Sequence, residues 1–203
     1  MVCANRHLLG SGGFVKRLHQ VVLVGSTVLA SWLGMQAVHE CGHVLAALLT
    51  GGEVKRVVLH PLTISRTDLG LNPEPLLVVW AGPAYGVLFP FALWGAVTAV
   101  QMPGSFVVRF FAGFCLIANG AYIAVGSFDR IGDCGEMLRH GSQMWQLWLF
   151  GAITIPGGLW LWHRQGAGFG LGSADGCVDL RVAYGTLVAF LLLVVIGYSV
   201  GGA

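Results

Sequence analysis

The chain has 203 residues, of which 56% are hydrophobic and only 10% are charged, and its mean hydropathy is +0.76. Soluble globular domains carry about 25% charged residues, so this composition excludes an ordinary soluble domain and predicts an integral membrane protein. The formal net charge is only +2 and no run of Lys and Arg occurs, which excludes nucleic acid as a partner.

The length limits the architecture to one polytopic membrane domain, residues 1–203. About 20 apolar residues cross a bilayer as a helix, so the chain holds about five transmembrane helices with short connections. The fold class is therefore predicted to be all-α, with the lipid bilayer as its environment. The apolar stretches that we expect to cross are residues 21–50, 76–100, 106–125, 144–162 and 182–200.

The first apolar stretch has a competing interpretation as a secretory signal peptide cleaved after Ala30. Basic residues precede it without an acidic one: Arg6, Lys16 and Arg17. The apolar run, however, continues past Ala30 to Thr50. We therefore expect an uncleaved, tilted span at residues 21–50, ended by the glycines Gly51 and Gly52.

A polar H-E-x-x-H motif, His39 to His43, lies inside this span. On a helix, His39 and His43 are about 40° apart around the axis and about 6 Å apart along it, so both rings can reach one ion. Glu40 is rotated about 100° from His39, which suits a residue that holds a metal-bound water instead of the metal. Charged groups at membrane depth are costly, so the motif predicts a functional site. The alternative is that the three side chains only hydrogen-bond neighbouring helices.

A short β-hairpin or edge strand at the membrane surface is expected directly after this helix. Residues 53–66 are rich in β-branched side chains, and turn residues follow at 67–75. Isolated within this segment, His60 is expected to be a surface residue. An ordinary connecting loop is the alternative interpretation.

Glycine and proline interrupt the second apolar stretch at residues 81–86 and again at Pro90. A polar segment, residues 126–141, follows the third stretch. Counting the crossings places this segment on the membrane side where the first span exits, so it can meet His39 and His43. A catalytic metal that needs a third protein ligand would find one there.

Three short motifs occur in or after these stretches: His39-Glu40-Cys41-Gly42-His43, Gly82-Pro83 and Gly132-Asp133-Cys134-Gly135. Together they resemble the site-2 protease family of intramembrane zinc metalloproteases, especially its compact M50B-like members. The resemblance covers about residues 21–140 as a metalloprotease core, with additional helices at about 143–202.

The resemblance implies a zinc enzyme with His39, His43 and Asp133 as metal ligands and Glu40 as the base that activates water. Its substrate would be a transmembrane segment of another membrane protein, cut within the bilayer. Asp133 also lies between glycines that allow its backbone to approach another helix. Asp129 is the next candidate ligand, ahead of Glu136 and His140, which also lie in the polar segment.

The chain departs from the family pattern in two places. The family's GPxxN motif ends here in Gly86, and its LDG-type motif reads Ile131-Gly132-Asp133-Cys134-Gly135. Substrate positioning is accordingly assigned to Gly82 and Pro83, with Asn119 of the third stretch as a substitute for the missing asparagine.

Three functions are consistent with these residues. The first is an intramembrane zinc metalloprotease, in which zinc acidifies a water molecule and Glu40 takes its proton. The second is a non-proteolytic zinc-binding protein or regulatory relative, in which Glu40 is dispensable. The third is a structural subunit that needs none of these side chains.

Overall fold

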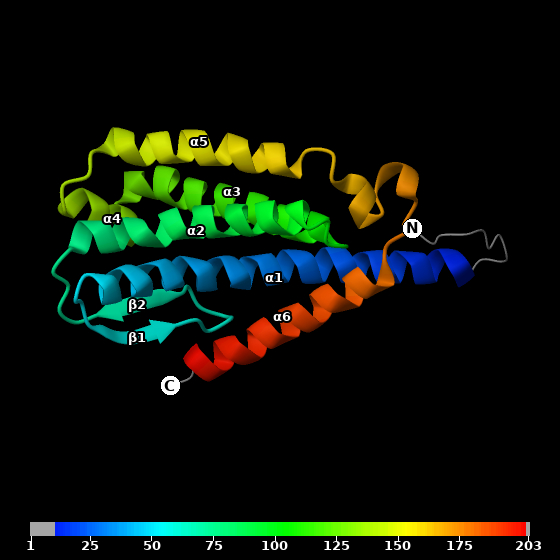
Figure 1. The fold of residues 1–203 in the computed structure, drawn as a ribbon, viewed down its shortest axis with the longest axis horizontal. Helices are drawn as coiled ribbons and strands as arrows, with labels where there is room; N and C mark the ends of the chain where they lie inside the picture. The colour runs from blue at the N-terminus through cyan, green and yellow to red at the C-terminus, as the bar shows by residue number, and fades with distance from the viewer. Residues whose placement is uncertain (1–10, 202–203) are drawn as a thin grey trace.

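The protein is described by a computed structural model of residues 11–201, and it is predominantly helical (Figure 1). Within these residues, four helices are long and apolar enough to cross a membrane. With the two-stranded hairpin after the first helix, they confirm the all-α membrane fold. The elements in chain order are α1 Ser11–Leu49, β1 Val54–Val58, β2 Arg66–Leu69, α2 Pro75–Ala99, α3 Ser105–Asp129, α4 Asp133–Arg139, α5 Met144–Trp162, the short 3₁₀ turns η1 Gly166–Phe169 and η2 Gly172–Ala174, and α6 Leu180–Gly201.

Helix α1 is longer than the predicted span at residues 21–50. It has 39 residues, or about 58 Å at 1.5 Å per residue, against a hydrocarbon core of about 30 Å. Lys16 and Arg17, which are good helix formers, lie in the turns before residue 21 and continue the helix towards the N-terminus. It ends where Gly51 adopts a positive φ of 75°.

The predicted hairpin is present. Strands β1 and β2 pair antiparallel, with an irregularity between Val54 and Arg56. The hairpin lies beside the C-terminal end of α1, and β2 contacts that helix (Figure 1).

Helix α2 runs without interruption through both prolines, where the sequence predicted breaks. Pro83 and Pro90 lie inside Pro75–Ala99, and both are buried. Each proline removes one backbone hydrogen bond. A membrane helix tolerates this loss where neighbouring helices cover the freed carbonyls, and α2 packs against α1 on one side and α3 on the other.

The helices are arranged around α1, with α2 and α3 on one side and α6 on the other (Figure 1). Helix α5 covers the outer side of α3. This 19-residue helix was predicted as a span. Within residues 11–201, however, the helices long and apolar enough to cross a membrane are α1, α2, α3 and α6. The short helix α4 lies at the same end as the hairpin and the C-terminus of α1, as the counting of crossings predicted (Figure 1).

Candidate metal centre

Near its C-terminal end, α1 carries the H-E-x-x-H side chains into the interior of the helix bundle. His39 and His43 are each 7% exposed, and Glu40 is 4% exposed. Because the two histidines are one turn apart, their rings approach closely and their Nε2 atoms are 3.1 Å apart. Buried polar groups require partners, so the contacts of these three side chains define the chemistry of the site.

Both histidines use Nδ1 for a hydrogen bond to the surrounding helices. The Nδ1–H of His43 donates to the carbonyl oxygen of Val78 in α2, at 2.9 Å. The Nδ1–H of His39 donates to Oδ1 of Asn119 in α3, at 2.7 Å, and the orientation of this amide is fixed because its Nδ2 donates to the carbonyl of Cys115. With the proton on Nδ1, each ring presents the lone pair of Nε2.

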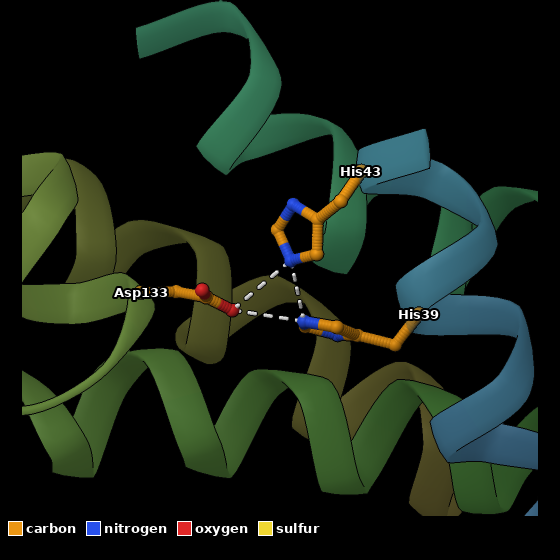
Figure 2. A group of neighbouring side chains, drawn as sticks. All are labelled: His39, His43 and Asp133. Carbon is orange, nitrogen blue, oxygen red and sulfur yellow. Dashed lines mark hydrogen bonds and ion pairs between the residues drawn. The ribbon is translucent and has the colours of Figure 1, made fainter. Parts of the chain in front are cut away.

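Asp133, the first residue of α4, completes the group (Figure 2). Its Oδ2 lies 2.8 Å from Nε2 of His39 and 3.4 Å from Nε2 of His43. These three residues are the group in the described part of the chain that could hold a metal ion, with all ligand atoms within 4.8 Å of one another. The structure therefore brings together the three residues that the resemblance implied as ligands.

The chemistry of the three atoms fits a zinc ion. Two imidazole nitrogens and a carboxylate oxygen point their lone pairs at one another without a proton between them, an arrangement that a cation stabilises. Adjacent ligands of a tetrahedral ion with bonds of 2.0 to 2.1 Å are about 3.3 Å apart, close to the spacings in this group. Gly82 of α2 leaves the necessary room, because a Cβ atom at this position would overlap both imidazoles.

The turn before α4 fixes the position of Asp133. Gly132 has φ 61° and ψ −140°, a conformation that favours glycine. A side chain there would also overlap the hydroxyl of Tyr122, which accepts a hydrogen bond from the backbone N–H of Asp133 at 3.1 Å.

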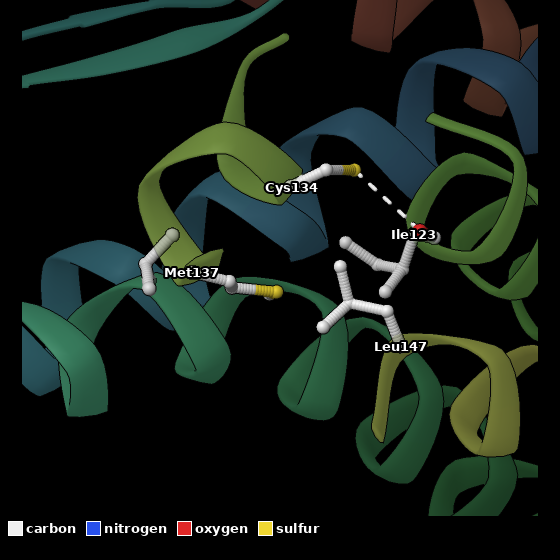
Figure 3. Packing of buried hydrophobic residues seen from close by; sticks show 5 residues of the cluster. Ile123, Cys134, Met137 and Leu147 are labelled. Atoms are coloured by element: carbon white, nitrogen blue, oxygen red, sulfur yellow. Dashed lines mark hydrogen bonds between the residues drawn. The ribbon is translucent and has the colours of Figure 1, made fainter. Parts of the chain in front are cut away.

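Apolar packing anchors α4, the helix that begins with Asp133 (Figure 3). Cys134 and Met137 are fully buried against Ile123 of α3 and Leu147 of α5. The Cys134 thiol donates a weak hydrogen bond to the carbonyl of Ile123, at 3.6 Å. Burial raises the pKa of this thiol to about 11, so it remains protonated and serves packing.

The other candidate ligands in the polar segment lie outside the metal group. Asp129 is exposed at the end of α3. Glu136 forms an ion pair with Arg139 one turn further along α4, and its other oxygen lies 3.4 Å from Nε2 of His140. The ion pair between Glu136 and Arg139 is the one that their spacing predicts.

A cavity of about 820 Å³ opens next to the metal group. It lies between α1, α2, α3, α4 and the β2 side of the hairpin. Glu40 lines it, and Oε2 of this carboxylate accepts a hydrogen bond from the Thr67 hydroxyl of β2, at 2.7 Å. Gln36 binds the backbone N–H of Ser65, so α1 holds the start of β2 at two points.

The residues expected to position substrate lie against the histidines. Gly82 packs on both rings, and Pro83 is buried in α2. Asn119 is 1% exposed, and both polar atoms of its amide are engaged, with His39 and with Cys115. A Cβ atom at Gly86 would lie 2.8 Å from Nδ2 of Asn119. The amide of Asn119 therefore fills the space that a side chain at residue 86, where the family has asparagine, would need.

Thr67 and Tyr122 are site residues that no sequence pattern indicates. Each is a single hydroxyl within a strand or helix, and neither has a characteristic spacing from the H-E-x-x-H motif. Their contacts with Glu40 and Asp133 arise only when the hairpin and α3 pack against α1 and α4.

The comparison with protein families gives one match: the family described as Peptidase M50B-like, over residues 18–123. The matched region begins in α1 and ends in α3, so it contains His39, Glu40 and His43 but ends before Asp133. No curated protein and no solved structure matches the chain.

Proposed function

Because the chain belongs to the Peptidase M50B-like family, we propose that it is an intramembrane zinc metalloprotease that hydrolyses peptide bonds in transmembrane segments of other membrane proteins. Family membership makes it a peptidase-type protein, and its four apolar helices make it a multi-pass membrane protein. The observation that carries the finer proposal is the position of Glu40. Its carboxylate lines the same cavity as a histidine–histidine–aspartate group that could hold a metal.

His39, His43 and Asp133 would hold the zinc ion. When bound, zinc polarises the peptide carbonyl and acidifies a water molecule. Thr67 holds Oε2 of Glu40, so we assign proton uptake to Oε1. Glu40 takes the proton from water as the water oxygen attacks the carbonyl carbon, and it then delivers that proton to the leaving amide nitrogen as the C–N bond breaks.

An extended substrate segment would lie along β2. Arg66, Thr67 and Leu69 of β2 line the cavity, whereas no residue of β1 does. A transmembrane helix hides its carbonyls in hydrogen bonds, so the substrate must unwind before it is cut. An exposed strand edge stabilises such an extended segment by main-chain hydrogen bonds.

The second candidate function is a zinc-binding relative that does not cut peptides. Gly86 favours it, because the asparagine of the family pattern is missing from α2. In such a protein Glu40 would be dispensable while zinc binding survived.

Replacement of Glu40 by glutamine separates these functions. The purified protein is reconstituted into liposomes with a panel of single-pass transmembrane peptides. Cleavage is followed by mass spectrometry and zinc content by elemental analysis. We expect Glu40→Gln to keep zinc and abolish cleavage, since an amide cannot accept the proton of water. His39→Ala should lose zinc, and Glu53→Gln, an exposed glutamate beyond α1, should change neither.

Three results would contradict the proposal. Cleavage that survives in Glu40→Gln would exclude Glu40 as the base. Loss of zinc together with cleavage in that variant would make Glu40 a ligand or a structural residue. Wild-type protein that binds zinc but cuts none of the peptides would favour the non-proteolytic relative.

A further inference from the structure

Tyr122 of α3 is a cavity-lining residue to which neither the motifs nor the proposed mechanism assigns a function. It lies one turn beyond Asn119 and is 42% exposed, whereas the amide of Asn119 is buried. Its ring meets that of His39 edge to face, with centroids 6.0 Å apart. Tyr122 is therefore adjacent to the metal group and open to the space that a substrate would occupy.

The hydrogen bonding of Tyr122 leaves its proton available. The hydroxyl oxygen accepts the backbone N–H of Asp133, at 3.1 Å. A phenol has one proton to donate in addition to its acceptor lone pairs, and it remains protonated at neutral pH. Within residues 11–201, no hydrogen bond donated by this hydroxyl occurs. The bond from Asp133 fixes the position of the oxygen, so the donor is held in place before substrate binds.

Two polar groups near Tyr122 are already engaged. The Thr67 hydroxyl donates to Glu40, and the Asn119 amide is occupied by His39 and Cys115. Peptide hydrolysis places negative charge on the carbonyl oxygen as water attacks. Enzymes stabilise that charge with donors positioned in advance.

We propose that Tyr122 is a catalytic residue that donates a hydrogen bond to the scissile carbonyl oxygen as it becomes negatively charged. No proton is transferred from Tyr122 in this step, and Glu40 remains the only group that gains and returns one. This inference rests on the proposed protease function. Gly86 of α2 has no side chain that could stabilise the charge, and the inference assigns this role to Tyr122 of α3.

The test compares Tyr122→Phe with the wild type in ligand binding as well as in cleavage. Three quantities are measured: the zinc dissociation constant by chelator competition, the affinity for acetohydroxamate, and the affinity for a phosphinic pseudopeptide with apolar side chains. Acetohydroxamate binds a zinc ion without mimicking the attacked peptide. The tetrahedral phosphinic group reproduces the charged oxygen. Tyr184→Phe is the matched control, because the Tyr184 hydroxyl contacts His19 near the opposite end of α1.

We expect Tyr122→Phe to bind the pseudopeptide about 100-fold more weakly and to lose a similar factor in kcat, as for the removal of one such donor in other enzymes. Zinc and acetohydroxamate affinities should change less than threefold. Tyr184→Phe should match the wild type throughout.

The unfavourable outcomes are distinguishable. Unchanged pseudopeptide affinity and kcat in Tyr122→Phe, with an active wild type, would overturn this inference alone. Parallel weakening of zinc and of both ligands would make Tyr122 a positioning residue for Asp133 and would also overturn it. A wild-type protein that binds no zinc and cuts no peptide would overturn the proposed function together with this inference.

Discussion

At the scale of single residues, two hydrogen bonds determine which nitrogen each histidine offers. Asn119 and the carbonyl of Val78 accept the Nδ1 protons of His39 and His43, so both Nε2 atoms face Asp133. Groups that hold a ligating histidine in this way fix its tautomer and orientation and raise its basicity. The metal group therefore depends on α2 and α3 as well as on the three residues that could hold an ion.

Replacement of Asn119 tests this dependence. We expect Asn119→Ala to weaken zinc binding about 10-fold to 100-fold, the usual cost of losing a partner of a ligating histidine. Zinc content should recover when free zinc is raised, because the three ligands remain. Chelator competition measures the affinity, and Asn72→Ala, another cavity-lining asparagine without contact to the histidines, is the control. An unchanged dissociation constant in Asn119→Ala would show that His39 is oriented without it.

The choice of third ligand is tested by two aspartate variants. Asp133→Ala should lose most of its bound zinc, because it removes one of three ligand atoms. Asp129→Ala should retain zinc, since Asp129 is exposed and lies outside the group. The measurement is the zinc stoichiometry of the two purified variants side by side. Full occupancy and activity in Asp133→Ala would remove Asp133 from the site.

The spacing of the H-E-x-x-H motif was sufficient to predict the histidine pair. Helical geometry alone brings His39 and His43 together. Asp133 lies 94 residues from His39, so its selection required the family resemblance and the flanking glycines. The contacts of Thr67 and Tyr122 could not be predicted, because they depend on how separate elements pack and not on any local pattern.

At the scale of elements, the hairpin contributes to the site through β2. Val58 of β1 is 6% exposed and pairs with Arg66. A proline at this position would disrupt the pairing of the hairpin itself. Thr67 is therefore the sharper test of how the hairpin acts on catalysis.

Replacing Thr67 by valine removes one hydroxyl at nearly constant volume. A hydrogen bond to a charged group contributes about 1.5 to 3 kcal/mol, so a misplaced Glu40 should lower kcat/KM about 10-fold to 100-fold. Zinc affinity should not change, because Thr67 touches no ligand. Thr63→Val, in the turn between the strands, is the control. Equal kcat/KM in Thr67→Val and wild type would show that this bond does not position Glu40.

The sequence located the five long helices and the hairpin, but it did not predict the short helix α4, and it misjudged some helix ends and interruptions. Glycine and proline at residues 81–86 predicted a break in the second span, yet α2 continues through Pro83 and Pro90. Local propensity describes an isolated segment, whereas α1 and α3 surround α2 and stabilise its helical form. The N-terminal turns of α1 were not predicted, because hydropathy marks only the apolar span and the helix extends beyond that span.

At the scale of the whole molecule, zinc would join α1 to α4. A ligand that binds only the folded state stabilises it in proportion to the logarithm of ligand concentration over its dissociation constant. We expect a zinc chelator to lower the melting temperature of the wild type by several degrees and added zinc to restore it. Because His39→Ala lacks a ligand, its melting temperature should respond to neither treatment. Thermal unfolding in detergent, with magnesium in place of zinc as a control, measures this effect. A chelator-insensitive wild type would contradict a metal bridge between these helices.

Helices α3 and α5 meet through four glycines placed seven residues apart on each helix: Gly113, Gly120, Gly151 and Gly158. Added Cβ atoms there would overlap the facing helix, so the two backbones are in direct contact. Such an interface has little freedom to adjust, and it backs the helix that carries Asn119 and Tyr122. The hairpin opposite is held to α1 by hydrogen bonds of Gln36 and Glu40 and by apolar packing of Val54 and Leu69. The cavity thus lies between a wall of directly packed helix backbones and a wall built from a two-stranded hairpin. We expect a bulky substrate to gain space on the hairpin side, so differences in substrate size should appear as movement of residues 64–67 while the metal group stays in place.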